Sequence, residues 1–300
     1  MRVLANDGLE KGAINELELL GVEVVTDHLE KDQLINKICD FDVLIVRSAT
    51  KVTADVLDAA SNGNLKLVIR AGVGVDNIDV PYAKKLNIDV RNTPSASSNA
   101  VAELALAHML AVSRYIGVSN FSMRNGQWNK KKYKGCEIAG KTLGIVGIGR
   151  IGRLLGEKAE ALGMNVIYTD LLGKQDNISF KYVEFEELLK ESDYISLHVP
   201  YDKNSGALIG KKEIELMKDG VFLINCARGK VVDEKALLEG LNSGKIAGAG
   251  IDVFEEEPTS NMELINHPNV SVTPHIGAST NEAQDRIGKE VVNIVKEYIR

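Results

Sequence analysis

The chain has 300 residues, the length of two average domains, and its 44% hydrophobic and 26% charged content is that of a folded globular protein, not a disordered or fibrous one. Three cysteines exclude a disulfide scaffold and favour a reducing compartment. The formal net charge of −6 argues against extended nucleic-acid or acidic-membrane binding. Because the first residues lack an apolar leader and no apolar run approaches the ~18 residues of a membrane span, we expect a cytoplasmic protein.

Short apolar runs rich in Val and Ile alternate with helix-like stretches along the chain, a pattern typical of parallel βα units. Two series of strands are predicted, at residues 2–5, 22–25, 42–48, 66–72 and 88–92, and then at residues 141–147, 164–170, 193–200, 220–227, 246–253 and 270–275. A helix is predicted for residues 235–244, with Gly244 at its C-cap. The sequence therefore predicts an α/β protein with parallel sheets.

Residues 93–115 separate the two strand series. Pro94 and the Ser97–Asn99 cluster indicate a helix start. The helix that follows is apolar nearly all round, at Val101, Leu104, Leu106, Met109 and Leu110. It suits a connector between domains or subunits, although an ordinary core helix has the same pattern. The polar stretch 124–135 is interpreted as an exposed loop or arm.

The motif G-x-G-x-x-G occurs at Gly147, Gly149 and Gly152, and its context gives it weight. An apolar strand runs into it, a helix of good formers leaves it, and the next strand ends in Asp170, eighteen positions after Gly152. This is the pattern of a dinucleotide-binding turn, although a glycine-rich βα turn without a ligand remains an alternative.

Each part of the motif has a physical task. Gly147 permits the tight turn, Gly149 lets the backbone approach a pyrophosphate, and Gly152 allows close helix–strand packing. The amides of Arg150 and Ile151 would meet phosphate oxygens at the helix N-terminus. Asp170 would accept hydrogen bonds from ribose hydroxyls and repel the additional phosphate of NADP, so NAD is the predicted cofactor.

Three later strands lead to residues suited to acid–base or anion chemistry, namely Arg228, Glu257 and His275. Ligands of open parallel sheets lie beyond the carboxyl ends of the strands, where such residues can converge. A histidine would take the hydroxyl proton of an alcohol while a hydride leaves, a carboxylate would orient its ring, and an arginine would hold a substrate carboxylate. Asp252 would approach the nicotinamide amide.

Simpler interpretations remain open for the same residues. A histidine after Thr-Pro is commonly a turn residue, an arginine after a strand is commonly a solvated cap, and spacing does not choose among Glu255, Glu256 and Glu257. His198 is interpreted as structural or cofactor-lining. Cys226 is interpreted as a wall of the cofactor site rather than a nucleophile, and no metal site is predicted.

Several long fragments resemble the D-isomer-specific 2-hydroxyacid dehydrogenases, and among them the phosphoglycerate dehydrogenases. They are residues 46–57, 69–80, 126–152, 225–234, 250–258 and 273–280. The resemblance implies that Glu257, which precedes the proline of the DVFxxEP motif, pairs with His275, and that Arg228 binds the substrate carboxylate. It implies a cofactor site formed by Gly147, Gly149, Arg150, Ile151, Gly152, Asp170, His198, Val199, Pro200, Cys226, Ala227, Asp252, Gly277 and Ala278.

The resemblance also implies a substrate site and an architecture. Substrate contacts fall on Arg47, Arg70, Gly72, Val73 and Gly74, with Lys130, Lys131 and Lys132 on an arm that would reach a partner subunit's substrate phosphate. Three adjacent lysines are otherwise a solvated loop. The implied fold has two doubly wound parallel-sheet domains with a cleft between them. A flavodoxin-like substrate domain spans residues 1–98 plus 280–300, and an inserted Rossmann NAD domain spans residues 99–279.

The activity implied is NAD-dependent oxidation of 3-phospho-D-glycerate to 3-phosphohydroxypyruvate, the first step of serine biosynthesis. The alternatives are a glyoxylate or hydroxypyruvate reductase, or another D-2-hydroxyacid dehydrogenase, and more remotely an NAD-sensing binding protein of the corepressor type. The expected partners are a small phosphorylated hydroxyacid and a second copy of the chain, with no nucleic acid and no membrane. Because the sequence stops at Arg300, a serine-sensing regulatory domain is not expected, and a homodimer through the connector helix and the arm is the simplest assembly.

Overall fold

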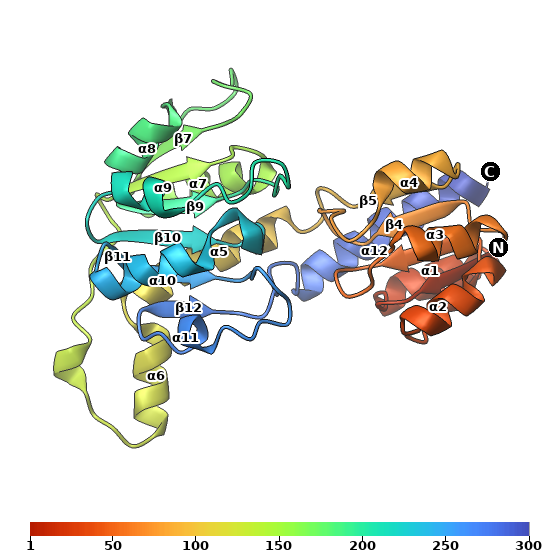
Figure 1. Ribbon diagram of the computed structural model, residues 1–300, viewed down its shortest axis with the longest axis horizontal. Coiled ribbons are helices and arrows are strands. Elements are labelled where there is room, and N and C mark those ends of the chain that lie inside the picture. Colours follow the sequence, from red (N-terminus) through yellow and green to blue (C-terminus); the bar gives the residue numbers. More distant parts are fainter. Residues whose placement is uncertain (300) are drawn as a thin grey trace. The chain divides into compact units, whose positions relative to one another are not determined.

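The computed structural model describes residues 1–299, which divide into two compact units (Figure 1). The N-terminal unit holds residues 1–98 and the segment from Ala278 onward, and the central unit holds residues 99–277. The central unit thus ends at 277, two residues before the expected 279. The reason is local, since Ala278 already packs against the apolar core of the N-terminal unit.

The N-terminal unit is built on a five-stranded parallel sheet of order β2-β1-β3-β4-β5, the flavodoxin-like order. Its elements are β1 (Arg2–Ala5), α1 (Lys11–Leu19), β2 (Glu23–Val25), α2 (Lys31–Lys37), the 3-10 turn η1 (Ile38–Asp40), β3 (Val43–Val46), α3 (Ala54–Ser61), β4 (Leu67–Arg70), α4 (Val80–Lys85), β5 (Asp89–Asn92) and the final helix α12 (Asn281–Ile299).

Alternating side chains divide the core of this unit into two layers. Val3 and Ile45 face α1 and α12, whereas Leu4 and Leu44 face α2, α3 and α4. Strand β3 is buried along its whole length, which is why residues 43–46 are continuously apolar. Helix α12 belongs here because its buried stripe completes the layer over α1, so the last segment of the chain returns to the first domain.

The central unit contains a seven-stranded parallel sheet of order β12-β11-β10-β9-β6-β7-β8, which is a Rossmann order. Its elements are α5 (Ser98–Ser113), α6 (Ile116–Arg124), η2 (Lys130–Lys132), β6 (Thr142–Val146), α7 (Arg150–Ala161), β7 (Asn165–Thr169), β8 (Lys181–Tyr182), α8 (Phe185–Glu191), β9 (Tyr194–Leu197), α9 (Lys211–Leu216), β10 (Val221–Asn225), η3 (Gly229–Val231), α10 (Glu234–Ser243), β11 (Ile246–Ile251), α11 (Met262–Ile265) and β12 (Val270–Val272).

Helices cover both faces of this sheet, α5 and α7 on one and α8, α9 and α10 on the other. Helix α5 packs directly against β11. The closeness requires Gly250, since a Cβ atom there would stand 2.5 Å from the Cβ atom of His108. The expected burial of α5 holds for Val101 and Met109, but Leu110 is 37% exposed. Figure 1 shows α6 and the following residues 125–135 extending away from the body of the unit, as expected for an arm.

Within residues 1–299 no single helix has the length and apolar character needed to cross a membrane, although the bent pair α5 and α6, which meet at 66°, reaches both when taken together.

Candidate active site

His275 and Glu257 form a close polar pair at the carboxyl edge of the central sheet. The Nδ1 atom of His275 lies 2.6 Å from Oε2 of Glu257. Burial raises the pKa of the Glu257 carboxyl, but the hydrogen bond and the charge of His275, an amide of Phe254 and the charge of Arg228 outweigh burial and lower it. The carboxylate therefore accepts the Nδ1 proton, which leaves the Nε2 lone pair of His275 available as a base.

Asp252, directly after β11, holds the loop that carries His275. Its buried carboxylate accepts hydrogen bonds from the Thr273 hydroxyl at 2.6 Å, from the Ile276 amide at 2.8 Å and from the Gly277 amide at 2.9 Å. The His275 amide also donates to the Asp252 carbonyl at 2.8 Å. These contacts maintain His275 at φ +54°, a left-handed conformation that costs about 1 kcal/mol or more for a non-glycine residue.

A buried chain of hydrogen bonds continues from this loop into α5. His108 Nε2 lies 2.9 Å from the Thr273 hydroxyl and Nδ1 lies 2.9 Å from the Ser271 hydroxyl. Burial lowers the pKa of His108, so its ring is neutral. Because Thr273 gives its one hydroxyl proton to the Asp252 carboxylate, it accepts from Nε2–H, and Nδ1 in turn accepts from Ser271. The protons are thus ordered in one direction, from Ser271 to Asp252.

Arg228, after β10, lies beside the same pair. Asn225 fixes its turn by donating to the Arg228 carbonyl at 2.9 Å and accepting from the Ala227 amide at 3.1 Å. Gly229 is required next, because a Cβ atom there would overlap the carbonyl of Phe254. This close approach brings the guanidinium to Glu257, whose pKa it lowers.

The glycine turn after β6 has the geometry of a phosphate site. Gly147 adopts φ +92°, and a Cβ atom on it would stand 2.6 Å from the His198 carbonyl oxygen. A Cβ atom on Gly152 would overlap the Gly147 carbonyl, whereas one on Gly149 would stand in open space. Gly149 begins α7 without a side-chain cap, so the first-turn amides, including those of Arg150 and Ile151, remain available to an anion. These residues fit a dinucleotide pyrophosphate.

The other predicted cofactor residues follow neighbouring strands. Each oxygen of Asp170 accepts one amide, from Ile148 at 2.9 Å and from Leu172 at 3.0 Å, and retains capacity for a hydroxyl donor. Burial lowers the pKa of His198 to about 4, so that imidazole is neutral. Burial and the charge of Asp252 raise the pKa of the Cys226 thiol, which makes it a poor nucleophile. Val199 and Pro200 follow His198, and Ala278 begins the return to the N-terminal unit.

The predicted substrate residues lie on the N-terminal unit and on the arm. Arg47 follows β3 and Arg70 ends β4, so both occupy the carboxyl edge of the five-stranded sheet. The Arg70 guanidinium lies against Gly72, where a Cβ atom would overlap it, and the Val73 carbonyl accepts from Asn92 at 2.5 Å before the chain reaches Gly74. Lys130, Lys131 and Lys132 form an exposed 3-10 turn.

The central unit thus brings together Arg228, Glu257 and His275, and gathers the glycine turn and Asp170 at the same sheet edge. Sequence reasoning missed the residues that hold the loops, namely Asp7, Thr50, Asn77, Asn225 and Thr273. Their signal is weak, because polar residues after a strand are ordinary turn formers. Among residues 1–299 no group of three or more His, Cys, Asp or Glu side chains is placed to hold a metal ion.

Comparison with known proteins extends this description. Residues 106–277 match the family model described as D-isomer specific 2-hydroxyacid dehydrogenase, NAD binding domain. The chain is 49% identical to a hydroxypyruvate reductase of Thermotoga maritima, over 99% of this chain and 98% of that one. It is 46% identical to a D-3-phosphoglycerate dehydrogenase of Methanocaldococcus jannaschii, over 100% of this chain and 58% of that longer one.

Among solved structures, a glyoxylate reductase from Paecilomyes thermophila superposes with a TM-score of 0.90 at 33% identity, covering 100% of this chain and 95% of that one. The resemblance and the two-domain α/β fold predicted from the sequence are confirmed, as is NAD, which the matching description names.

Proposed function

This chain belongs to the D-isomer specific 2-hydroxyacid dehydrogenase family, and we propose that it interconverts 3-phospho-D-glycerate and 3-phosphohydroxypyruvate with NAD, the first step of serine biosynthesis. The observation that carries the proposal is the Arg228, Glu257 and His275 constellation beside a dinucleotide turn. Several relatives at 42–46% identity carry the name D-3-phosphoglycerate dehydrogenase.

The residues supply the acid–base and anchoring parts of the reaction. The glycine turn and Asp170 would hold NAD, which would supply the acceptor for the hydride that leaves C2 of the hydroxyacid. His275 Nε2 takes the hydroxyl proton, and the Glu257 carboxylate stabilises the imidazolium that forms while holding its ring in place. Arg228 binds the substrate carboxylate and polarises the adjacent C2 oxygen. In the reverse direction His275 returns the proton.

The proposed preference for a phosphorylated substrate rests on cationic side chains. Lys130, Lys131 and Lys132 are exposed on the arm, and among residues 1–299 the Arg47 guanidinium has no hydrogen bond or ion pair. A steady-state comparison of 3-phosphohydroxypyruvate, hydroxypyruvate and glyoxylate with NADH tests the proposal. We expect the highest kcat/KM for the phosphorylated acid, and a clear preference for either of the other two would overturn it.

The second candidate is a hydroxypyruvate reductase. It is favoured by the Thermotoga maritima relative, which matches this chain from end to end. The two candidates share C1 and C2 chemistry and differ only in the group on C3, so the same substrate panel separates them. Partner capture that depends on NAD, without turnover of any hydroxyacid, would instead indicate a binding protein of the corepressor type.

Asp170 supports a preference for NAD over NADP. Its carboxylate lies at the end of β7, where it would repel a 2′-phosphate, and the next two side chains, Leu171 and Leu172, are exposed and uncharged. The ratio of kcat/KM for NADH to that for NADPH measures this preference, and a ratio near one would contradict it.

A homodimer is supported by apolar side chains at the end of α5, on α6 and on the arm. They are Leu110, Ile116, Phe121, Met123 and Trp128, each at least 37% exposed. Such a group of exposed apolar side chains marks an interaction surface. Light scattering of the wild type and of the Phe121→Glu and Trp128→Glu double variant tests it. The wild type should have the mass of a dimer and the variant that of a monomer.

A further inference from the structure

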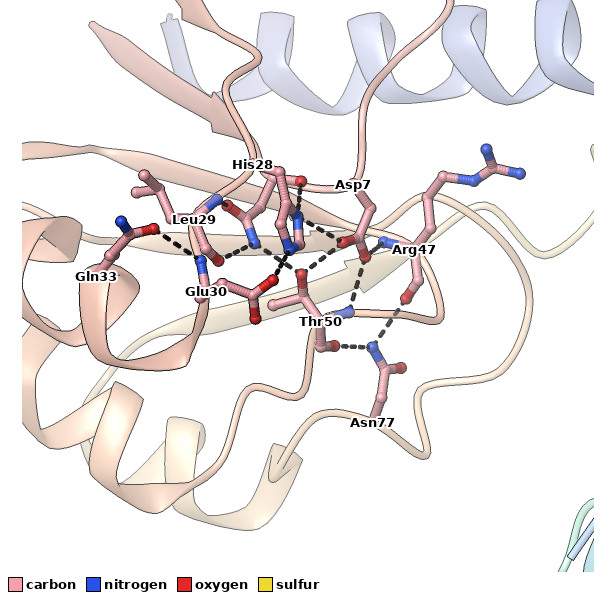
Figure 2. Close-up of polar contacts among 9 residues, drawn as sticks. Asp7, His28, Leu29, Glu30, Gln33, Arg47, Thr50 and Asn77 are labelled. Atoms are coloured by element: carbon pink, nitrogen blue, oxygen red, sulfur yellow. Dashed lines mark hydrogen bonds and ion pairs between the residues drawn. The ribbon is translucent and has the colours of Figure 1, made fainter. Parts of the chain in front are cut away.

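The loop at residues 47–50 is held by two side chains at four of its backbone polar groups (Figure 2). The carboxylate of Asp7 accepts the amides of Arg47 at 2.7 Å and Thr50 at 3.0 Å, and the Thr50 hydroxyl at 2.5 Å. The amide of Asn77 donates to the carbonyls of Arg47 at 2.8 Å and Thr50 at 2.7 Å. The loop's backbone is therefore fixed without support from a sheet or helix.

An ionised acid is what these donors require at position 7. The Asp7 side chain is only 5% exposed, and the nearest histidine nitrogen, Nδ1 of His28, lies 3.9 Å away. A buried carboxylate is costly unless it is hydrogen-bonded, and here three donors of one short loop satisfy it. An asparagine with its oxygen in the Oδ2 position would still accept both amides, but it would turn an NH2 group toward the Thr50 hydroxyl, which already accepts from Asn6, so this contact would be lost and the loop loosened.

The side chain of Arg47, in contrast to its backbone, is not held by any other residue of the described range 1–299. Figure 2 shows the Arg47 guanidinium pointing away from the contacts that fix its backbone, and no hydrogen bond or ion pair reaches it within the described part of the chain. A fixed backbone with an unpaired cation is suited to binding an anionic group of a ligand at the carboxyl edge of the sheet.

We propose that Asp7, assisted by Asn77, is a positioning residue that fixes the 47–50 loop so that Arg47 binds an anionic group of the substrate. This inference rests on the proposed function, because it takes the ligand to be an anionic 2-hydroxyacid or 2-oxoacid. Asp7 itself does not touch the substrate. It lowers the KM by removing the loop motion that binding would otherwise have to restrict.

The test is Asp7→Asn, assayed with the 2-oxoacid that the wild type reduces most efficiently. We expect the KM for that acid to rise about tenfold while kcat and the KM for NADH change less than about twofold, which is the signature of lost substrate binding. In an Arg47→Met background, Asp7→Asn should leave the KM unchanged, because the residue through which it acts is gone.

Asp42→Asn is the matched control. Asp42 accepts the Arg2 amide at 2.7 Å at the opposite end of β3, so the same change there should leave both KM values unchanged. If Asp7→Asn does not fold, Thr50→Val should raise the KM, whereas Thr50→Ser, which retains the hydroxyl, should keep the wild-type KM. An equal KM increase with and without Arg47, or lower activity at unchanged KM, would overturn the inference. A preference for an unphosphorylated acid would overturn the proposed function while leaving this test intact.

Discussion

The loops after β3 and β12 belong to different units, yet the same arrangement holds both. In each, a buried aspartate accepts two backbone amides and one threonine hydroxyl. Asp7 does so for residues 47–50 and Asp252 for residues 273–277. In each, the aspartate follows a strand that neighbours the strand leading into the loop, β1 beside β3 and β11 beside β12. Parallel neighbours make this possible because their carboxyl ends share one edge.

The two loops differ in the side chain they carry. His275 is itself oriented, by a 2.6 Å contact with Glu257 and by a left-handed backbone, whereas only the backbone of Arg47 is fixed. A proton-transfer group must be placed before the reaction begins, since misorientation costs rate. A long, flexible cationic side chain that binds an anion can adjust its conformation when the ligand arrives. We therefore expect changes at the 273–277 loop to lower kcat and changes at the 47–50 loop to raise KM.

The largest effect should come from removing His275, the proposed proton-transfer group. In His275→Ala, kcat should fall about 10³-fold, the range of general acid–base catalysis, while KM for the oxoacid changes little. Steady-state kinetics across pH measures it, and the pH dependence of kcat should flatten. A variant that keeps more than a tenth of wild-type kcat would remove His275 from the mechanism.

Next in size is Asp252→Asn. The change keeps one acceptor oxygen but turns an NH2 group toward at least one loop donor, such as the Gly277 amide, at a cost of about 2 kcal/mol. This cost corresponds to a kcat about 30-fold lower if the His275 loop bears the whole loss. Steady-state kinetics and urea unfolding would separate misplacement from instability. Should KM rise and kcat stay constant, the contrast between the two loops would be wrong.

A smaller effect is expected from the threonine of the same loop. Thr273→Val removes the hydroxyl between His108 and Asp252 and should lower the free energy of unfolding by about 1 kcal/mol and kcat by about fivefold. Thr273→Ser retains the hydroxyl and should behave as the wild type. A wild-type kcat in Thr273→Val, or an equal loss in Thr273→Ser, would show that the hydroxyl contacts with His108 and Asp252 are not what positions the loop.

The smallest effect is on the pH dependence of stability. The pKa of Glu257 is lowered in the folded protein, so the stability that its carboxylate contributes is present above the ordinary glutamate pKa of about 4.3 and is lost as pH falls through the lowered value. The Tm difference between the wild type and Glu257→Gln should be a few degrees at most near neutrality, and it should close in acid. Thermal melts from neutral pH to pH 3 measure it, and a difference that widens in acid would contradict the sign.

Sequence patterns predicted the elements whose signals are local. Strand β3 is four apolar residues in a row, and the glycine turn is confined to six positions. The very short strand β8 and helix α6, with its mixture of Gly, Ser and apolar residues, were not predicted because neither has a clear period. The fold class followed from the alternation of the longer elements, which is independent of such details.

Sequence reasoning proposed only the charged and titratable side chains of the candidate site, and those proposals remain predictions. Arg47 and His275 stand out by residue type, but their anchors do not, since Asp7 and Thr50 are 43 positions apart and meet only through strand order. Asp252 was identified, with the nicotinamide amide as its expected partner. The structure adds that its carboxylate already accepts three hydrogen bonds from the His275 loop. Contacts of this kind depend on three-dimensional neighbours that no spacing rule specifies.

The one-way order of protons from Ser271 through His108 to Asp252 makes His108 a spectroscopic probe already present in the molecule. Its neutral ring is held in a single tautomer, with the proton on Nε2, so nitrogen-15 labelling of histidine would give two well-separated ring signals. Any event that loosens the His275 loop would average those signals together. The order of the His275 loop could thus be monitored through a side chain of α5, without a dye and without turnover.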